Sequence, residues 1–181
     1  MPDSSSEQIT GWLSEQITEF KGLTGRVVES WRGIEMALRE YTTNGPQFSD
    51  PNVPCLQLVQ LEPTLDGADC RTIDTYQDDA CFGLRLAIPH LHGQEWAGIY
   101  RESELSLPIG RIDAATVRLE TGTLAEVTLS IGSVSILLMA AEINERNNGS
   151  FEWHRFDESV LVFLEPTDAD QIEWIPPRLS E

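Results

Sequence analysis

The chain has 181 residues, of which 30 are acidic and 12 are basic, so its formal net charge at pH 7 is −18. A field of this sign repels phosphate backbones and anionic lipid, which excludes nucleic acid and membrane surfaces as direct partners. The same charge attracts a basic protein and also keeps a protein soluble. Apolar residues make up 40% of the chain, and no apolar run approaches the roughly 18 residues of a membrane span.

The first residues contain neither the basic region nor the apolar core of a secretory signal, so we expect a cytoplasmic protein. The three cysteines, Cys55, Cys70 and Cys81, are odd in number and widely spaced, without a C-x-x-C pair. This spacing is typical of neither a zinc site nor a redox motif. We therefore expect reduced thiols and no cofactor.

Residues 1–22 predict one helix that covers a face of a sheet. Gly22 is expected to end it. Apolar and neutral side chains recur at helical spacing in this segment: Ile9, Trp12, Leu13, Gln16, Ile17 and Phe20.

Residues 24–43 fit two structures. As a helix, their apolar side chains fall on one face; as a hairpin, runs 26–32 and 34–42 meet at a turn at Arg32-Gly33. We favour the hairpin, because Gly25-Arg26-Val27 resembles Gly110-Arg111-Ile112, which also leads into a predicted strand. The prolines that follow, from Pro46 to Pro54, predict a loop.

From Cys55 onward the pattern is β. Alternating apolar residues and turn signals predict strands at 55–61 (ending at Pro63), 71–76 and 81–88, then a polar connection over 94–109 with room for a short helix. The run 134–143 is the most apolar of the chain and is expected to be the floor of the core, between strands 125–131 and 159–164. Gly132 and residues 147–149 mark turns, and residues 172–177 are expected to be an extended tail that packs Trp174 on the body.

The β segments also suggest an internal repeat. Val59-Gln-Leu-Glu resembles Val117-Arg-Leu-Glu at an offset of 58 residues, and the next two predicted strands correspond in order. The sequence therefore predicts an α+β fold, mostly antiparallel β-sheet built from two similar multi-strand units, with one N-terminal helix packed on it. The units are residues 23–109 and residues 110–181 with the C-terminal tail; together they are expected to form one compact domain.

A metal site is suggested only by His90 and His92, which would point to the same side of a strand. No third ligand follows at a spacing typical of a metal site, and Pro89 and Gly93 predict a loop. Two histidines at the surface are therefore the simpler interpretation.

Asp157 and Glu158 are the candidate carboxylate pair, close in sequence to Trp153 and His154. Because adjacent residues of a strand point to opposite faces, we do not expect these two carboxylates to converge. They are more simply acids on a polar turn. Together with Trp96, Trp153 and Trp174, they are the candidate partner-binding residues, since aromatic side chains are enriched at interfaces.

The sequence contains no phosphate-binding loop, dinucleotide fingerprint, nucleophile elbow or H-E-x-x-H motif, so no catalytic residue is assigned. In composition the chain resembles the small acidic cytosolic proteins that accompany bacterial toxins as inhibitors. This resemblance and the charge favour a non-enzymatic binding module for a basic protein, such as an immunity-type inhibitor. The alternatives are a small metal-dependent enzyme or metal-binding protein built on His90 and His92, and a homo-oligomeric structural protein that pairs exposed sheet edges.

Overall fold

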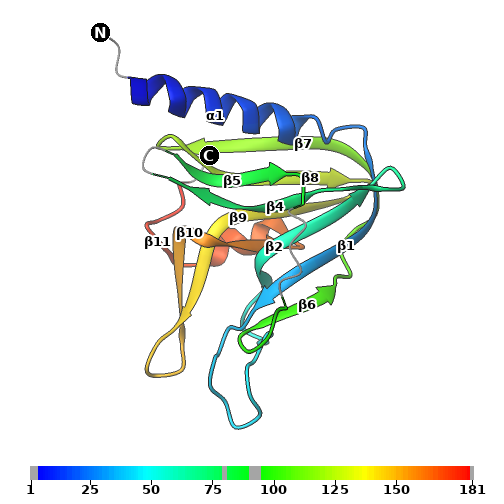
Figure 1. Ribbon diagram of the computed structural model, residues 1–181. Coiled ribbons are helices and arrows are strands. Elements are labelled where there is room, and N and C mark those ends of the chain that lie inside the picture. The colour runs from blue at the N-terminus through cyan, green and yellow to red at the C-terminus, as the bar shows by residue number, and fades with distance from the viewer. Residues whose placement is uncertain (1–3, 79–80, 90–94, 180–181) are drawn as a thin grey trace.

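The computed structural model describes residues 4–78, 81–89 and 95–179, and it has the predicted α+β composition, dominated by antiparallel strands (Figure 1). Its elements in chain order are α1 (Ser4–Lys21), β1 (Val27–Met36), β2 (Cys55–Leu65), β3 (Asp69–Cys70), β4 (Thr72–Gln77), β5 (Phe82–Ala87), β6 (Tyr100–Glu104), β7 (Gly110–Glu120), β8 (Thr123–Ile131), β9 (Val134–Glu145), β10 (Phe151–Phe163), the 3-10 helix η1 (Pro166–Gln171) and β11 (Trp174–Ile175).

The predicted N-terminal helix is confirmed, and it packs on the sheet. α1 lies along β5 and β7, as Figure 1 shows, with Phe20 fully buried and Leu13 half-buried against the core. Gln16 is buried on the same face, where its side-chain oxygen accepts a hydrogen bond from the backbone N–H of Leu86 at 2.9 Å. The helix ends before Gly22, whose N–H donates to the carbonyl of Thr18.

The predicted hairpin over residues 26–42 is wrong, and so is the helical alternative. β1 is one continuous strand that passes straight through Arg32-Gly33. Gly33 lies between Leu61 of β2 and Ser103 of β6, and a Cβ atom at Gly33 would stand 2.8 Å from Cδ1 of Leu105. This glycine therefore serves close packing inside a strand and not a turn.

Two other boundaries differ from the predicted ones. β2 continues past Pro63 to Leu65, because Pro63 faces Trp31 of β1 across the sheet and its carbonyl accepts from the N–H of Arg71. In residues 95–109, the part of the predicted connection that the structure describes, there is no short helix, and this part contributes β6, which pairs with β1.

The strand pairings close on themselves. β1 pairs with β2, β2 with β10, β10 with β9, β9 with β8, β8 with β7, and β7 returns to β1 through Val27 and Val28. β4 and β5 form a second path from β2 to β8. The last step of that path is the parallel pair Gly83 and Leu124, where the two backbones approach closely.

The two-unit organisation is not confirmed. Strands predicted for the first unit, residues 23–109, pair directly with strands of the second, residues 110–181: β1 with β7, β2 with β10 and β5 with β8. The repeated segments also pair differently, since β2 meets β4 at one residue pair whereas β7 and β8 pair along their length.

Two hydrophobic cores lie on the two faces of β9 and β10. Ile136 and Leu138 of β9 belong to the first core, which also contains Trp31 and Phe20. The second core lies under η1 and the C-terminal segment and consists of Leu137, Met139, Ala141, Ile143, Leu161, Phe163, Ala169 and Trp174 with Leu38 and Val53. Residues 136–141 of the run 134–143 are thus buried on both faces, which confirms the core position predicted for the run, between β8 and β10, although Val134 at its start is 40% exposed.

The side of the molecule opposite α1 consists of projecting segments. In Figure 1 the β9–β10 hairpin and the loop between β1 and β2 extend downward, away from the helix. Arg39 of that loop ties the two together, because its guanidinium donates to Glu145 at 2.6 Å and to the carbonyl of Gly149 at 2.9 Å.

Candidate functional site

The C-terminal segment, residues 164–179, crosses the outside of β10 and carries the predicted residue Trp174. β11 pairs in parallel with β10, Trp174 beside Trp153 and Ile175 beside His154. The Trp174 ring is 4% exposed, packs edge-on against Trp153 with 5.6 Å between centroids, and donates its N–H to the carbonyl of Ala169 at 2.7 Å. The tail thus packs Trp174 on the body as predicted, and this indole is a buried anchor.

Buried ion pairs hold the end of this segment. Arg178 donates two hydrogen bonds to Glu126 of β8, at 2.8 and 2.9 Å, and the Glu126 side chain is only 4% exposed. Arg155 of β10, whose side chain is 1% exposed, binds the carboxylate of Glu120 and the carbonyl of Pro177. These contacts lower the pKa of Glu120, chiefly through the Arg155 hydrogen bond, and raise the pKa of Arg178, chiefly through Glu126.

Two open pockets flank the C-terminal segment. The larger, with a volume of about 800 Å³, lies between the segment and β7–β8 and contains the side chains of Arg118, Glu126 and Arg178, which are engaged with one another. The smaller, about 460 Å³, lies on the other side, and we name it the aromatic–acidic pocket. Its lining is Pro51, Asn52, Pro54, Arg146, Phe151, Glu152, Trp153, Asp168, Gln171, Ile172, Glu173 and Ile175.

A bulge in β10 contains both Asp157 and Glu158. The pairing with β9 jumps from Arg155–Ala141 to Val160–Ala140, so residues 156–159 are extra on the β10 side, with Phe156 at a φ of 60°. The N–H of Glu158 binds the carboxylate of Asp157 at 2.8 Å, and the carbonyl of Glu158 accepts from Thr75 of β4 at 2.6 Å. Such bulges re-aim side chains that would otherwise alternate.

The charges of Asp157 and Glu158 both act on Glu142 of β9, and the bulge replaces the strand alternation on which the expectation of diverging side chains is based. The pKa of Glu142 is raised by burial first and by the charge of Asp157 next, with a smaller contribution from Glu158. A hydrogen bond from Ser159, at 3.2 Å, and the nearby imidazole of His154 oppose this rise.

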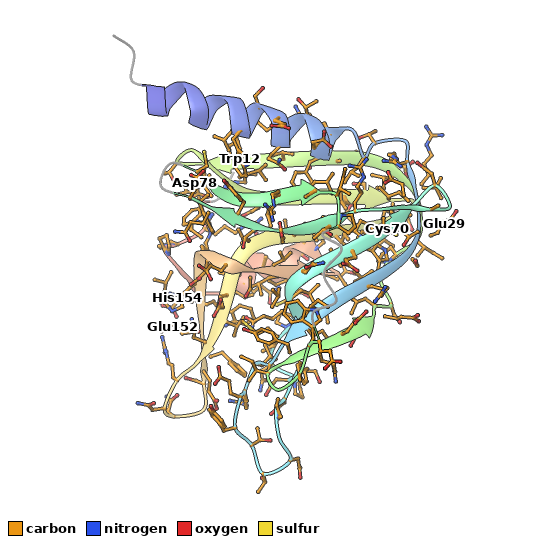
Figure 2. All side chains as sticks on the ribbon, viewed as in Figure 1. Trp12, Glu29, Cys70, Asp78, Glu152 and His154 are labelled. Carbon is orange, nitrogen blue, oxygen red and sulfur yellow. The ribbon has the colours of Figure 1, made fainter. Side chains whose placement is uncertain are left out.

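The aromatic–acidic pocket and the bulge are continuous along β10. Glu152, which lines the pocket, accepts from Arg146 at 2.8 Å and lies 3.0 Å from Nε2 of His154. His154 in turn pairs with Glu142 across the β9–β10 ladder. Figure 2 shows Glu152 and His154 together at the left of the molecule, near the β9–β10 hairpin.

Of the five predicted partner-binding residues, Trp153 and Trp174 pack against each other, and Asp157 and Glu158 lie in the bulge of β10. Trp96 is half-buried elsewhere, edge-on to Tyr100 of β6 with 5.4 Å between ring centroids. His90 and His92 lie outside the described residues. Within residues 4–78, 81–89 and 95–179, no group of three His, Cys, Asp or Glu side chains has an arrangement that could hold a metal ion.

Sequence reasoning missed Glu142, Asp168 and Glu173. Glu142 had a readable signal, because it is the one charged residue inside the apolar run 134–143 and a buried strand accommodates a carboxylate at a cost. Asp168 and Glu173 had none, since their role depends on where the C-terminal segment lies.

No family model, no curated protein and no solved structure matches the chain. In the part of the chain that the structure describes, no helix has the length and apolar character needed to cross a membrane.

Proposed function

We propose that this protein is a non-enzymatic binding module for a basic protein, and that the outer surface of β10 is the contact region. The surface comprises the aromatic–acidic pocket, the Glu152–His154 pair and the bulge carboxylates Asp157 and Glu158 with Glu142. An inhibitor that neutralises a basic toxin, as an immunity-type protein does, is a function of this kind.

The distribution of ion pairs supports the proposal. Most arginines pair with carboxylates of the protein itself, so the remaining carboxylates make the electrostatic potential at the surface negative. Ten of them form such pairs: Arg26, Arg32, Arg39, Arg71, Arg85, Arg101, Arg118, Arg146, Arg155 and Arg178.

The observation that carries the proposal is the bulge of β10, which holds the half-buried Asp157 and the exposed Glu158 next to Ser159, whose hydroxyl donates to Glu142 of β9. Burial raises the pKa of Glu142 first, and like-charge repulsion from Asp157 and, to a smaller extent, Glu158 raises it further. An arrangement of this kind costs stability in the free protein, and a cation supplied by a partner would relieve it. Electrostatic attraction would also speed association with a basic protein.

The test is affinity purification from the native host with three forms of the protein. One is the natural chain, and one carries Glu142→Gln, Asp157→Asn and Glu158→Gln. The third is a control with the same change of charge at exposed positions elsewhere: Glu15→Gln, Glu29→Gln and Glu40→Gln. In Figure 2, Glu29 lies on the opposite side of the molecule from Glu152 and His154.

The proposal expects a basic protein to be retained by the natural chain and by the control, and to be lost with the site variant or at high salt. Equal retention by the site variant and the control would contradict the contact region. Recovery of no basic protein at any salt concentration would contradict the function.

A further inference from the structure

We infer that the aromatic–acidic pocket binds an arginine side chain of the basic partner. This inference rests on the proposed function and specifies which chemical group of the partner enters which site. The pocket combines the two features that bind a guanidinium, which are aromatic surface and carboxylates that form no ion pair with any residue the structure describes.

The aromatic surface comes from β10. Phe151 and Trp153 are half-buried, and both line the pocket while packing against the second core. Their rings are held in place from behind, since Trp153 meets Trp174 edge-on. A ring fixed in this way offers its remaining surface to a ligand without losing side-chain freedom on binding.

The carboxylates come from the C-terminal segment. Asp168 of η1 is half-buried and Glu173 is exposed, and both line the pocket. Among the described residues neither of them forms an ion pair, whereas the third pocket carboxylate, Glu152, is engaged by Arg146 and His154. Asp168 and Glu173 are therefore the groups available to an incoming cation.

Arginine fits this combination better than lysine. A guanidinium is planar, stacks on aromatic rings and donates to two carboxylate oxygens at once, while an ammonium is a compact and strongly hydrated charge. The protein already uses this geometry on Phe151, where the guanidinium carbon of Arg39, a residue that does not line the pocket, lies 4.3 Å from the ring centroid. That face of Phe151 is therefore occupied, and Trp153 is the ring that stacks with the ligand. Arg101 on Phe48 repeats the geometry at 4.2 Å.

The experiment is a nuclear magnetic resonance titration of the ¹⁵N-labelled full chain with three small probes. These are N-acetyl-arginine amide, N-acetyl-lysine amide and N-acetyl-citrulline amide, the last being the neutral isostere of arginine. The inference expects saturable shifts of the Trp153 indole N–H and of the backbone N–H of Glu173 with the arginine probe. Its Kd should be in the millimolar range and at least about five times lower than that of the lysine probe, with no saturation by citrulline.

Variants make the test specific. Asp168→Asn with Glu173→Gln should weaken arginine binding about tenfold, and Trp153→Leu should weaken it by a similar factor. The matched control, Glu29→Gln with Glu165→Gln, removes two exposed carboxylates that do not line the pocket and should bind the probe as the natural chain does. Thermal unfolding of each variant shows that the fold is retained.

Three outcomes would overturn the inference: equal response to lysine and arginine, shifts spread over acidic residues without Trp153, or equal weakening by the control pair. If one of these outcomes is found while the site variant at Glu142, Asp157 and Glu158 still fails to retain the partner, the arginine site is wrong and the proposed function stands. If arginine binds as expected while no basic protein is recovered, the pocket is right and the proposed function fails.

Discussion

Arg178 and Glu126 join the end of the chain to the middle of β8 by two hydrogen bonds, of 2.8 and 2.9 Å, in a place where the Glu126 side chain is almost fully enclosed. Arg118 and Arg155 stand 3.8 and 3.9 Å from the same carboxylate. Glu126 is therefore the common counter-charge of three arginines, and the C-terminal segment depends on it.

Replacing Glu126 by alanine should destabilise the protein strongly. The change leaves Arg155 and Arg178 in a poorly hydrated site without this partner, and breaking a buried pair costs about 3 kcal/mol of the free energy of unfolding. Urea unfolding measures it. Glu102→Ala, which breaks the exposed pair with Arg32, should change stability by only about 0.5 kcal/mol, and an equal effect of the two variants would contradict the argument.

Glu142→Gln should stabilise the protein at neutral pH by about 0.5 kcal/mol, because it removes a carboxylate whose charge is disfavoured by burial and is repelled by Asp157 and Glu158. The pKa of Glu142 is higher in the folded than in the unfolded chain, so its ionised form costs stability above the folded pKa, and this cost disappears as the pH falls through that pKa. Urea unfolding at a series of pH values should show the advantage of the glutamine shrinking on acidification. An advantage that does not vary with pH would contradict the assignment.

Glu120→Gln supplies the control of opposite sign. Arg155 lowers the pKa of Glu120, so the stability that this carboxylate contributes is present above its ordinary pKa and is lost as the pH falls through the lowered one. The variant should be less stable than the natural chain at neutral pH, and the deficit should shrink in acid.

Gly83→Ala should cost about 3 kcal/mol or more. Gly83 has a φ of 143°, and a Cβ atom there would lie 2.7 Å from the backbone nitrogen and oxygen of Leu124, where β5 meets β8. Gly149→Ala is the control, since its φ is 81° but nothing stands within 4 Å of the added atom, and it should cost only about 1 kcal/mol. Thermal unfolding of the two variants compares them, and similar melting temperatures would mean that β5 and β8 separate easily.

Gln16→Leu should cost about 2 kcal/mol, although it makes the helix face more apolar. Its side-chain oxygen is the acceptor for the buried N–H of Leu86, which the leucine would leave without a partner. Hydrogen exchange of the Leu86 amide should become faster in the variant. Ser14→Leu, at an exposed position of the same helix, should leave that exchange rate unchanged.

The predictable part of this fold is the part in which side-chain pattern and neighbour agree. Phe20 lies on the apolar stripe of α1 and is buried in the first core, because an apolar stripe at helical spacing is stable in water only when it packs against other apolar surface. Residues 136–141 of the most apolar run are buried, as the pattern predicts. The interpretation of Gly33 failed because a glycine in a sequence is compatible both with a turn and with close packing inside a strand. Only the structure, in which Leu105 lies close to Gly33, shows that close packing is the reason here.

The candidate site was predictable only in part, for a similar reason. The tryptophans and the pair at Asp157 and Glu158 stand out in the sequence by residue type. Their positions do not, because the four-residue bulge of β10 sets them, and the alternation of an ideal strand does not apply there. The acids of the C-terminal segment reach the pocket through the pairing of β11 with β10. This pairing involves only two residues of β11, which is too short a segment to be predicted from its sequence pattern.

β9 sends Ile136 and Leu138 into one core and Leu137 and Met139 into the other. Because β9 contributes side chains to both hydrophobic cores, neither core can lose its packing without disturbing the strand that the other core also needs. We therefore expect the two cores to unfold together, and a substitution in β9 to affect the packing of both.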